Sequence, residues 1–452
     1  MAATALVPDV TVTAAEPVTS QAPQWPLWQR VLFRFFFVYL LFQTEPWFLF
    51  NDIPGVPFLS RYYSQAMDWA VQQSNTRVFR VWDTLVQPNG SGDTSWAFTQ
   101  MWMLLGVAAI ACAVWSVVDR KRPSYDRALY WLRTILRYYL ASAALSYGII
   151  KLFALQMPFP SVSQLATPLG DLLPMRFSWL FIGYSVPYQF FSGAMETLAG
   201  LLLLSRRTVT AGLFAAMGAF LNVVMINLSY DVPVKLFSSH LLFASVFLLA
   251  LDYKRILGFM VLNRSVPATN AWQPRYAKPW HRWVALGVKL FIVWVILVQP
   301  LQNSWTRYKA LKAPPVPGPF QVGFYDVRHY VVNHDTIPAA SADTLRWKDV
   351  IIDNLTAGSV NTHDGVFWQR YRRGYFRYKP DTTHRMLSVW KVSTIPRDST
   401  FLFTMRYEVP DSVTVRFHTM IRNDSVHVEM VRVPRHFQLS ERQFHWLSEY
   451  NR

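Results

Sequence analysis

The chain has 452 residues, a formal net charge of +17 and a composition that is 52% hydrophobic but only 16% charged. Soluble globular domains usually carry about 25% charged residues, so this chain is not a soluble protein throughout. We do not expect nucleic acid as a partner, because the Lys and Arg of membrane proteins gather on cytoplasmic loops and beside anionic lipid. The single cysteine, Cys112, excludes an intramolecular disulfide and a CxxC redox centre.

Residues 1–27 are expected to form a disordered cytoplasmic tail. Residues 1–25 are rich in Ala, Thr, Val and Pro. They lack the basic segment and compact apolar core that mark a secretory signal peptide. The first hydrophobic helix is therefore expected to be the signal for membrane insertion.

Apolar blocks of transmembrane length occupy residues 28–304. A helix needs ~20 apolar residues to cross a hydrocarbon core of ~30 Å, so this region is predicted to be an all-α polytopic membrane bundle of about seven transmembrane helices. The predicted spans are residues 29–49, 97–118, 131–155, 179–204, 208–229, 233–251 and 282–302. The fourth block contains Pro187, and an alternative division gives an interfacial segment at 172–185 and a span at 187–204.

The connection at residues 51–96 is predicted to lie outside the membrane. Its stretch "FLSRYYSQAMDWAVQQSNTRVFRVWDTLV" places apolar and polar residues at helical spacing, which is typical of an amphipathic helix on a membrane surface. The following "QPNGSGDTS" is a polar turn that returns the chain to the bilayer.

Basic residues are concentrated after the second, fourth and sixth predicted spans, at 119–127, 206–207 and 254–282. Because positively charged short loops stay in the cytoplasm, the N-terminus is predicted to be cytoplasmic. With seven spans, the C-terminal domain would then lie on the periplasmic side of a bacterial inner membrane.

Ionisable side chains occur inside several predicted spans. Each costs ~2.5–3.5 kcal/mol on insertion scales, so each is a candidate for function. Arg34, Arg137 and Lys289 lie close to cytoplasmic ends, where long side chains reach the interface, and we assign them structural roles. Glu45 precedes Pro46 at the external end of the first span and is expected to be hydrated.

Five further ionisable residues are predicted to line an outward-facing polar pocket. They are Lys151, Glu196, Asp231, Lys235 and His240. Glu196 lies between Gly193 and Gly200, on a face of small residues that lets helices approach closely. Asp231 and Lys235 are four residues apart and could form an ion pair. The alternative is that these side chains form interhelical ion pairs that hold the bundle together.

After a Pro-rich linker at 305–318, residues 319–452 are predicted to form a small antiparallel β barrel or sandwich. Short segments such as "MLSVWKV" and "FLFTMRYEV" alternate between apolar and polar residues. The stretch "VTVRFHTMIRNDSVHVEMVRV" predicts a hairpin that turns at residues 422–425. The last segment, "QLSERQFHWLSEYNR", is expected to be helical or turn-like and to plug one end of a barrel.

This C-terminal domain also holds eight of the ten histidines, none in the HExxH spacing of metal ligands, so no metal site is predicted. A basic cluster alternates there with aromatic residues and is predicted to bind lipid headgroups, an acidic glycan or an acidic partner. Its members are Arg370, Arg372, Arg373, Arg377 and Lys379. A solvated strand face is the alternative.

Two stretches carry a family resemblance: "RYYLASAALSYGIIKLF", in which Lys151 follows Arg137 by fourteen residues, and "GAMETLAGLLLLSRRTVTAGLFAAMGAFLNVVM", which contains Glu196. With them, residues 131–252, about a quarter of the chain, resemble the DoxX family of small bacterial membrane proteins. Members of that family are linked to thiosulfate:quinone oxidoreduction and to membrane redox-stress complexes. The residues leave the cofactor open, and the resemblance implies a quinone for that role, together with a membrane redox partner.

A membrane bundle followed by an outer β-rich domain is also similar in outline to the vitamin K-dependent carboxylase-like (HTTM) proteins. Two functions remain open. The favoured one is a non-catalytic envelope protein, held in the lipid bilayer by the bundle, whose outer domain binds other envelope proteins. The alternative is a quinone-, thiol- or sulfur-linked membrane oxidoreductase, or a subunit of one, in which Lys151, His240 and Glu196 supply charge and protons.

Overall fold

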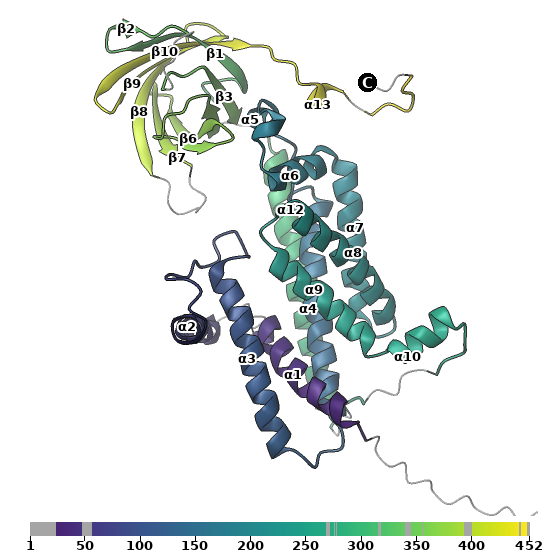
Figure 1. Cartoon of the computed structure of the whole chain (residues 1–452). Helices are drawn as coiled ribbons and strands as arrows, with labels where there is room; N and C mark the ends of the chain where they lie inside the picture. Colours follow the sequence, from purple (N-terminus) through teal and green to yellow (C-terminus); the bar gives the residue numbers. More distant parts are fainter. Residues whose placement is uncertain are drawn as a thin grey trace, which may run out of the picture.

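The computed structural model of the chain consists of a helical region followed by a β barrel (Figure 1). It describes residues 24–47, 57–267, 272–274, 276, 278–314, 318–339, 345–354, 356–392, 400–442 and 444–449. Most of the predicted N-terminal tail, residues 1–23, lies outside the described residues.

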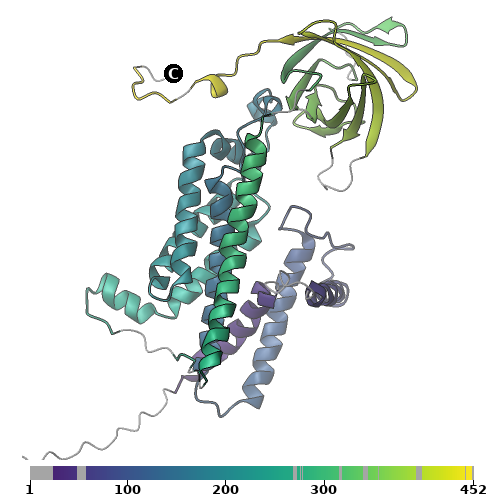
Figure 2. The same ribbon diagram turned by 180° about the vertical axis from the view of Figure 1, so that it is seen from behind.

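The long helices of the first region lie side by side in a bundle, and α2 lies across α3 (Figures 1 and 2). Their bounds are α1 Leu27–Thr44, α2 Pro57–Ser74, α3 Ser95–Val118, α4 Asp126–Leu152, α6 Pro174–Tyr184, α7 Val186–Leu204, α8 Val209–Ser229, α9 Lys235–Ala250, α11 Pro279–Val293 and α12 Gln299–Lys312. Short helical segments are η2 Asn75–Phe79, α5 Val162–Leu165, η3 Leu169–Asp171, α10 Tyr253–Ile256, η4 Leu257–Val261 and η5 Trp294–Val298. The helix expected between residues 58 and 86 is present as α2 and η2 as far as Phe79, and residues 80–86 are not helical.

Among the described residues, three helices are long and apolar enough to cross a membrane: Ser95–Val118, Val209–Ser229 and Pro279–Lys312. A fourth is added if α9 and residues 253–261, which meet at a bend of 73°, count as one span. The predicted number of about seven is therefore wrong by this measure. Polar residues within the helices explain the difference, because α1 carries Arg30 and Arg34, α7 carries Gln189 and Glu196, and α4 carries four Arg and Lys residues.

The fourth predicted block is divided, as the alternative interpretation expected. It consists of α6 and α7, which meet at Ser185, and the Ser185 side chain accepts a hydrogen bond from the Tyr188 amide at the start of α7. Pro187 lies in the first turn of α7, where its missing N–H breaks no helical hydrogen bond.

α4 lies in the middle of the bundle and packs most closely against α7. One face of α4 carries fully buried leucines at residues 132, 136, 140 and 145. Where α4 faces α7, glycines lie on both helices. A Cβ atom added to Gly148 of α4 would lie 2.5 Å from Thr197 Oγ1, and one added to Gly193 of α7 would lie 2.7 Å from the Gly148 carbonyl oxygen. Only glycines permit this approach of the two helices.

The two ends of the bundle differ in charge. The basic segments 119–127, 206–207 and 253–256 lie at the end away from the barrel, whereas α5 and α6 lie at the barrel end (Figures 1 and 2). At the barrel end, α12 continues to Lys312, so the predicted linker at 305–318 is wrong over its first eight residues. The polar stretch "WTRYKALK" extends the helix beyond its apolar part.

The C-terminal domain is a closed antiparallel barrel, which decides between the barrel and the sandwich. Its strands are β1 Gly323–Val332, β3 Asp349–Asn354, β4 Ala357–Val360, β6 Arg373–Asp381, β7 Met386–Lys391, β8 Phe401–Glu408, β9 Thr414–Ile421 and β10 Asp424–Val433. Each pairs with the next in that order, and β1 pairs with β10 to close the barrel. The short strands β2 Asp335–Thr336 and β5 Trp368–Arg370 pair with β1 and β6.

The predicted hairpin at the end of the domain is confirmed. β9 and β10 pair from Asp424↔Ile421 to Val431↔Thr414, and the turn residues Arg422 and Asn423 both have positive φ, 52° and 76°. Such a pair of left-handed residues matches the twist of a two-residue hairpin.

The barrel interior is filled by its own side chains. Phe320, Tyr325, Trp347, Phe367 and Phe376 are among the buried residues of this core, and the cavity left among the core side chains measures about 10 Å³, too small for a ligand. The prediction that the last segment plugs one end of the barrel is wrong. It leads away from β10 through α13, Gln438–Glu441 (Figure 1), and the carbonyl oxygen of Arg442 accepts a hydrogen bond from Tyr184 at the end of α6.

Candidate functional site

A cavity of about 210 Å³ lies at the barrel end of the bundle, between α4, α6, α7, α8 and α9. Its lining is mainly apolar and aromatic, with a few polar groups. The lining residues include Tyr147, Lys151, Trp179, Ser192, Glu196, Phe220, Val223, Ile226, Asn227 and Ser238. An apolar cavity with a small number of placed polar groups is typical of a small-molecule site.

Lys151 and Glu196 form the ionic centre of this cavity. Lys151 comes from the last turn of α4, Glu196 from the middle of α7, and both are buried. The Lys151 Nζ donates a hydrogen bond to Glu196 Oε1. A Cβ atom added to Gly193 would lie 2.7 Å from Lys151 Cβ, so the glycine gives the lysine room to reach the carboxylate.

The second carboxylate oxygen of Glu196 is buried and accepts no hydrogen bond from the part of the chain that the structure describes. Desolvating an ion pair is costly, and the cost is offset only where further hydrogen bonds satisfy the remaining lone pairs. Glu196 also lines the cavity, so a hydrogen-bond donor bound there would lie beside the residue whose Oε2 lacks a partner.

Uncharged amides shape the same cavity, and the sequence interpretation missed them. Gln189 is fully buried, its Oε1 accepts from the Met157 amide at 3.1 Å, and its Nε2 donates to the Met157 carbonyl at 2.8 Å. Asn227 Nδ2 donates to Ser238 Oγ at 2.9 Å and so joins α8 to α9. Amides in apolar helices are a signal for interhelical bonding, and these positions could have been found on that basis.

Asp231 and Lys235 pair with each other, as expected, at 2.7 Å. Neither lines the cavity, because Asp231 is exposed and Lys235 lies beside Asp93, at 3.8 Å. The Asp93 carboxylate also accepts hydrogen bonds from the backbone amides of Lys235 and Leu236, at 2.8 and 2.9 Å. Asp93 thus caps the N-terminus of α9 from a distant turn, and the prediction that this corner lines the pocket is wrong for both residues.

His240 is buried on the opposite side of α9, against α1. Its Nδ1 lies 2.7 Å from the Leu236 carbonyl, and its Nε2 lies 2.6 Å from the Tyr39 hydroxyl. A carbonyl only accepts, so Nδ1 carries the proton and Nε2 accepts from Tyr39. Both ring nitrogens are satisfied away from the cavity, which corrects the placement of His240 in the pocket.

The members of the basic cluster of the barrel differ in burial and in partners. Arg373 is buried and bonds to Asp349 Oδ1 at 2.5 Å and to Ser359 Oγ at 2.8 Å, so its assignment to a surface that binds lipid or a partner is wrong. Arg372 pairs with Asp171 of the helical region at 2.9 Å, and Arg370 stacks on Trp368 and Tyr371. Arg377 and Lys379 are exposed on the outer face of β6, and Arg372 is exposed as well.

The buried Arg373 also supports a contact between the barrel and the helical region. Ser163, at the start of α5, is fully buried, and its hydroxyl lies 2.6 Å from that of Ser359. Its backbone amide donates to Asp353 Oδ1 at 2.8 Å. The connection between α4 and α6, whose residues Gln156 and Met157 line the cavity, is thereby fixed to the barrel.

The histidines of the barrel form no metal site: among the described residues, no group of three or more His, Cys, Asp and Glu side chains could hold a metal ion. His418 and His427 face each other across β9 and β10 through a Nδ1–Nδ1 hydrogen bond. Burial, and then the neighbouring His427, lower the pKa of His418 below its usual value.

The comparisons with known proteins leave this site without an assigned role. No family model matches the chain. The chain is 37% identical over 81 residues to the uncharacterized protein YwoB of Bacillus subtilis (strain 168), which corresponds to 18% of this chain and 53% of that protein. No solved structure matches. The chain thus spans about half the length of this relative, and the function has to be argued from the cavity itself.

Proposed function

We propose that the protein is a non-catalytic, multi-pass protein of the bacterial inner membrane whose bundle binds a small amphiphilic molecule in the Lys151–Glu196 cavity. The observation that carries this proposal is Glu196, which lines a mainly apolar cavity and whose buried Oε2 has no hydrogen-bond partner among the described residues. A binding role requires only this complementarity and no reactive group.

The cavity favours a ligand with a hydrogen-bond donor at one end. A hydroxyl, amide or ammonium group would complete the bonding of Glu196 Oε2, and an apolar body would lie against Phe220, Val223 and Ile226. A ligand carboxylate is disfavoured. Lys151 already donates to Glu196, and the negative charge of the ligand would be repelled by the Glu196 carboxylate.

The sidedness of the bundle supports a periplasmic barrel. The basic segments lie at the end away from the barrel (Figure 1), and positively charged segments stay in the cytoplasm. The cavity and the barrel would then both face the outside. In this arrangement the barrel is the outer binding domain, with Arg377 and Lys379 exposed to envelope partners or lipid.

The barrel is also placed to affect the cavity. Ser163 and Asp353 fix the α4–α6 connection to the barrel, and Gln189 fixes Met157 of the same connection to α7. Movement of the barrel on binding a partner would therefore pull on the rim of the cavity. We infer that partner binding and ligand binding are coupled through this connection.

The test is ligand retention by the full chain, purified in mild detergent and analysed by mass spectrometry of extracted small molecules. Val223→Trp fills the cavity, and its matched control Val114→Trp adds the same side chain on the exposed face of α3. The wild type and the control are expected to retain the same amphiphile, and Val223→Trp to lose it. Equal retention by both variants, or no bound molecule in the wild type, would contradict the proposal.

The alternative is a quinone-, thiol- or sulfur-linked oxidoreductase, and one observation favours it. Lys151 lines the cavity, and quinone reduction needs a proton source such as an ammonium group beside the ring. A quinone among the retained molecules, with a Tm that rises on adding that quinone, would select this alternative. Retained molecules without redox activity would select the binding role.

A further inference from the structure

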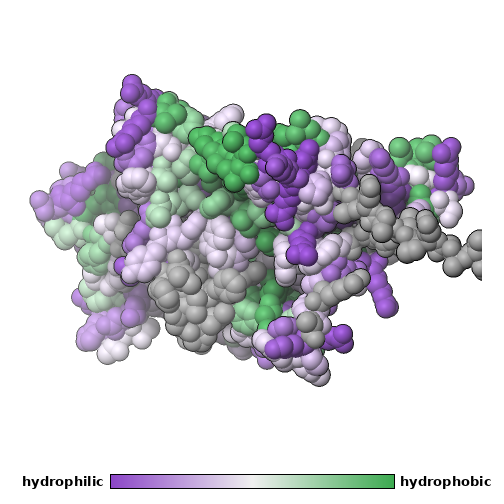
Figure 3. Space-filling view, turned by 90° about the horizontal axis from the view of Figure 1, so that it is seen from below, coloured by the Kyte–Doolittle hydropathy of each residue, from purple (hydrophilic) through white to green (hydrophobic). Residues whose placement is uncertain are grey.

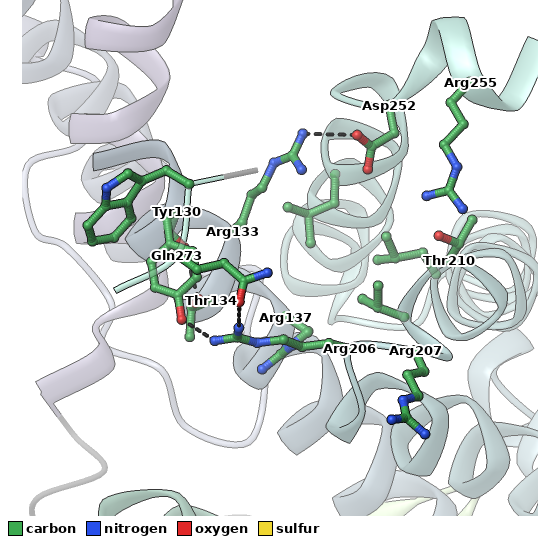
Figure 4. Close-up of a pocket in the computed structure, with 14 residues that line it drawn as sticks. Tyr130, Arg133, Thr134, Arg137, Arg206, Arg207, Thr210, Asp252, Arg255 and Gln273 are labelled. Carbon is green, nitrogen blue, oxygen red and sulfur yellow. Dashed lines mark hydrogen bonds and ion pairs between the residues drawn. The ribbon is translucent and has the colours of Figure 1, made fainter. Parts of the chain in front are cut away.

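A second cavity lies at the basic end of the bundle, where α4, α8 and the end of α9 approach the turn between α7 and α8 (Figure 4). Its volume is about 370 Å³. Side chains from five separate segments reach it, including Trp272 and Gln273 from the chain between η4 and α11. The proposed function makes no use of this cavity.

The cavity has a large excess of positive charge. It is lined by five arginines, Arg133, Arg137, Arg206, Arg207 and Arg255, and by a single carboxylate, Asp252. Asp252 is paired with Arg133 at 3.2 Å. Figure 4 shows Arg133, Asp252 and Arg255 on one side of the space and Arg137, Arg206 and Arg207 on the other. Four of the arginines therefore line the cavity without a carboxylate to balance them.

One of these arginines, Arg206, is held in place by neutral groups. Arg206 donates to the Tyr130 hydroxyl and, at 3.3 Å, to Gln273 Oε1. Within the described residues, the guanidinium groups of Arg137, Arg207 and Arg255 form no hydrogen bond or ion pair, and the Nε of Arg137 is buried. Like charges brought together without counterions repel one another, so this arrangement favours an anion between them.

An apolar groove continues from the arginines along α11. A hollow of about 1000 Å³ shares Arg137, Arg206 and Arg207 with the first cavity and extends past Val284, Val288 and Ile292. α11 has no buried residue and belongs to a candidate membrane span. From below, hydrophilic and hydrophobic side chains lie next to one another on this face (Figure 3).

We propose that this site binds an anionic phospholipid, with its phosphate between Arg137, Arg206 and Arg207 and its acyl chains in the groove along α11. Guanidinium groups donate two parallel hydrogen bonds to a phosphate, which a lysine cannot do. A soluble phosphate would share the arginines but would leave the adjoining groove without an occupant. The excess of at least three charges selects an anionic lipid over a zwitterionic one.

The experiment measures lipid binding to the detergent-purified full chain by native mass spectrometry. The probes are phosphatidylglycerol and phosphatidylcholine with identical acyl chains. Inorganic phosphate is added separately as a soluble competitor. The wild type is expected to bind phosphatidylglycerol about tenfold or more tightly than phosphatidylcholine. Inorganic phosphate at equal concentration is expected neither to displace the lipid nor to raise the Tm.

The variant Arg137→Gln/Arg207→Gln is expected to lower the affinity for phosphatidylglycerol about tenfold or more and to leave that for phosphatidylcholine unchanged. The control Arg120→Gln/Lys121→Gln removes two exposed charges at the same end of the bundle, outside the cavity, and is expected to bind like the wild type. Arg137→Lys/Arg207→Lys keeps the charge and is expected to weaken binding to an intermediate degree, which separates loss of the site from loss of folding.

Three results would overturn the proposal. Equal binding of the two lipids by the wild type would show that the arginines do not select charge. Equal loss in the cavity variant and its control would assign the effect to general surface charge. Displacement of the lipid by inorganic phosphate, or stabilisation by phosphate alone, would assign the site to a small soluble anion.

Discussion

Glu196 and Lys151 can be buried only because each carries the other's countercharge. Both side chains lie within the bundle, and Lys151 Nζ donates to Glu196 Oε1. A buried charge that loses its partner destabilises the fold more than the loss of the whole pair does. The sequence identified both residues as unusual for an apolar helix, but it could not pair them, because 45 positions separate them.

Lys151→Met is therefore expected to lower the free energy of unfolding by about 3–5 kcal/mol, since it leaves the Glu196 carboxylate buried without a cation. The double variant Lys151→Met/Glu196→Met removes both charges and is expected to recover most of that loss. Thermal unfolding of the two variants and the wild type, in the same detergent, provides the measurement. A double variant less stable than Lys151→Met would show that the pair does not act as a unit.

His418 predicts a pH dependence in the barrel. Burial and His427 lower its pKa in the folded state, so the unfolded chain binds the proton more tightly. The resulting stability is present above the unfolded pKa of about 6.5 and is lost as the pH falls below it. Hydrogen–deuterium exchange in β9 and β10 is expected to speed up between pH 7.5 and pH 5.5, after correction for the intrinsic rate. In His418→Gln this change should be smaller, and an equal change in both proteins would contradict the assignment.

The elements differ in how far the sequence predicts them. The hairpin of β9 and β10 could be predicted, because alternation over adjacent segments fixes both the strands and their register. The contact of α4 with α7 could be predicted only in part. The small residues from Gly193 to Gly200 indicate that another helix packs closely against α7, but they do not indicate which helix it is. The cap that Asp93 provides for α9 was missed, because a polar turn carries no sign of which helix end it reaches.

The close approach of α4 and α7 provides a test at two glycines. In Gly193→Ala, the new Cβ would lie 2.7 Å from the Gly148 carbonyl oxygen and from Lys151 Cβ, so we expect a loss of about 1–3 kcal/mol in the free energy of unfolding. A Cβ at Gly106, on α3, meets nothing within 4 Å. Gly106→Ala is expected to be neutral or stabilising by up to about 1 kcal/mol. Similar effects of the two variants would mean that α4 and α7 do not touch at Gly193.

For the whole molecule, the sequence predicted a helical bundle followed by a β domain and placed the basic segments at one end. It overestimated the helices that are long and apolar enough to span a membrane, because Arg34, Lys151, Glu196 and similar residues lie in helices that pack inside the bundle. It missed the arginine cavity, because Arg137, Arg206 and Arg207 were each explained separately, by snorkelling or by loop charge. Their convergence depends on the packing of α4 against the α7–α8 turn.

The central proposal is an orientation in which the barrel and the Lys151–Glu196 cavity face the outside of the bacterial inner membrane while the arginine cavity faces the cytoplasm. Cysteine labelling tests it most directly, because Cys112 is the single native thiol and is buried. On a Cys112→Ala background, Ser412→Cys places a thiol on an exposed turn of the barrel, and Lys121→Cys places one in the exposed α3–α4 turn.

In intact spheroplasts, a membrane-impermeant maleimide is expected to label Ser412→Cys and to leave Lys121→Cys unlabelled until the membrane is permeabilised. Labelling of Lys121→Cys in intact spheroplasts, with Ser412→Cys protected, would reverse the orientation. That result would contradict both an outward-facing cavity and a lipid site in the cytoplasmic leaflet.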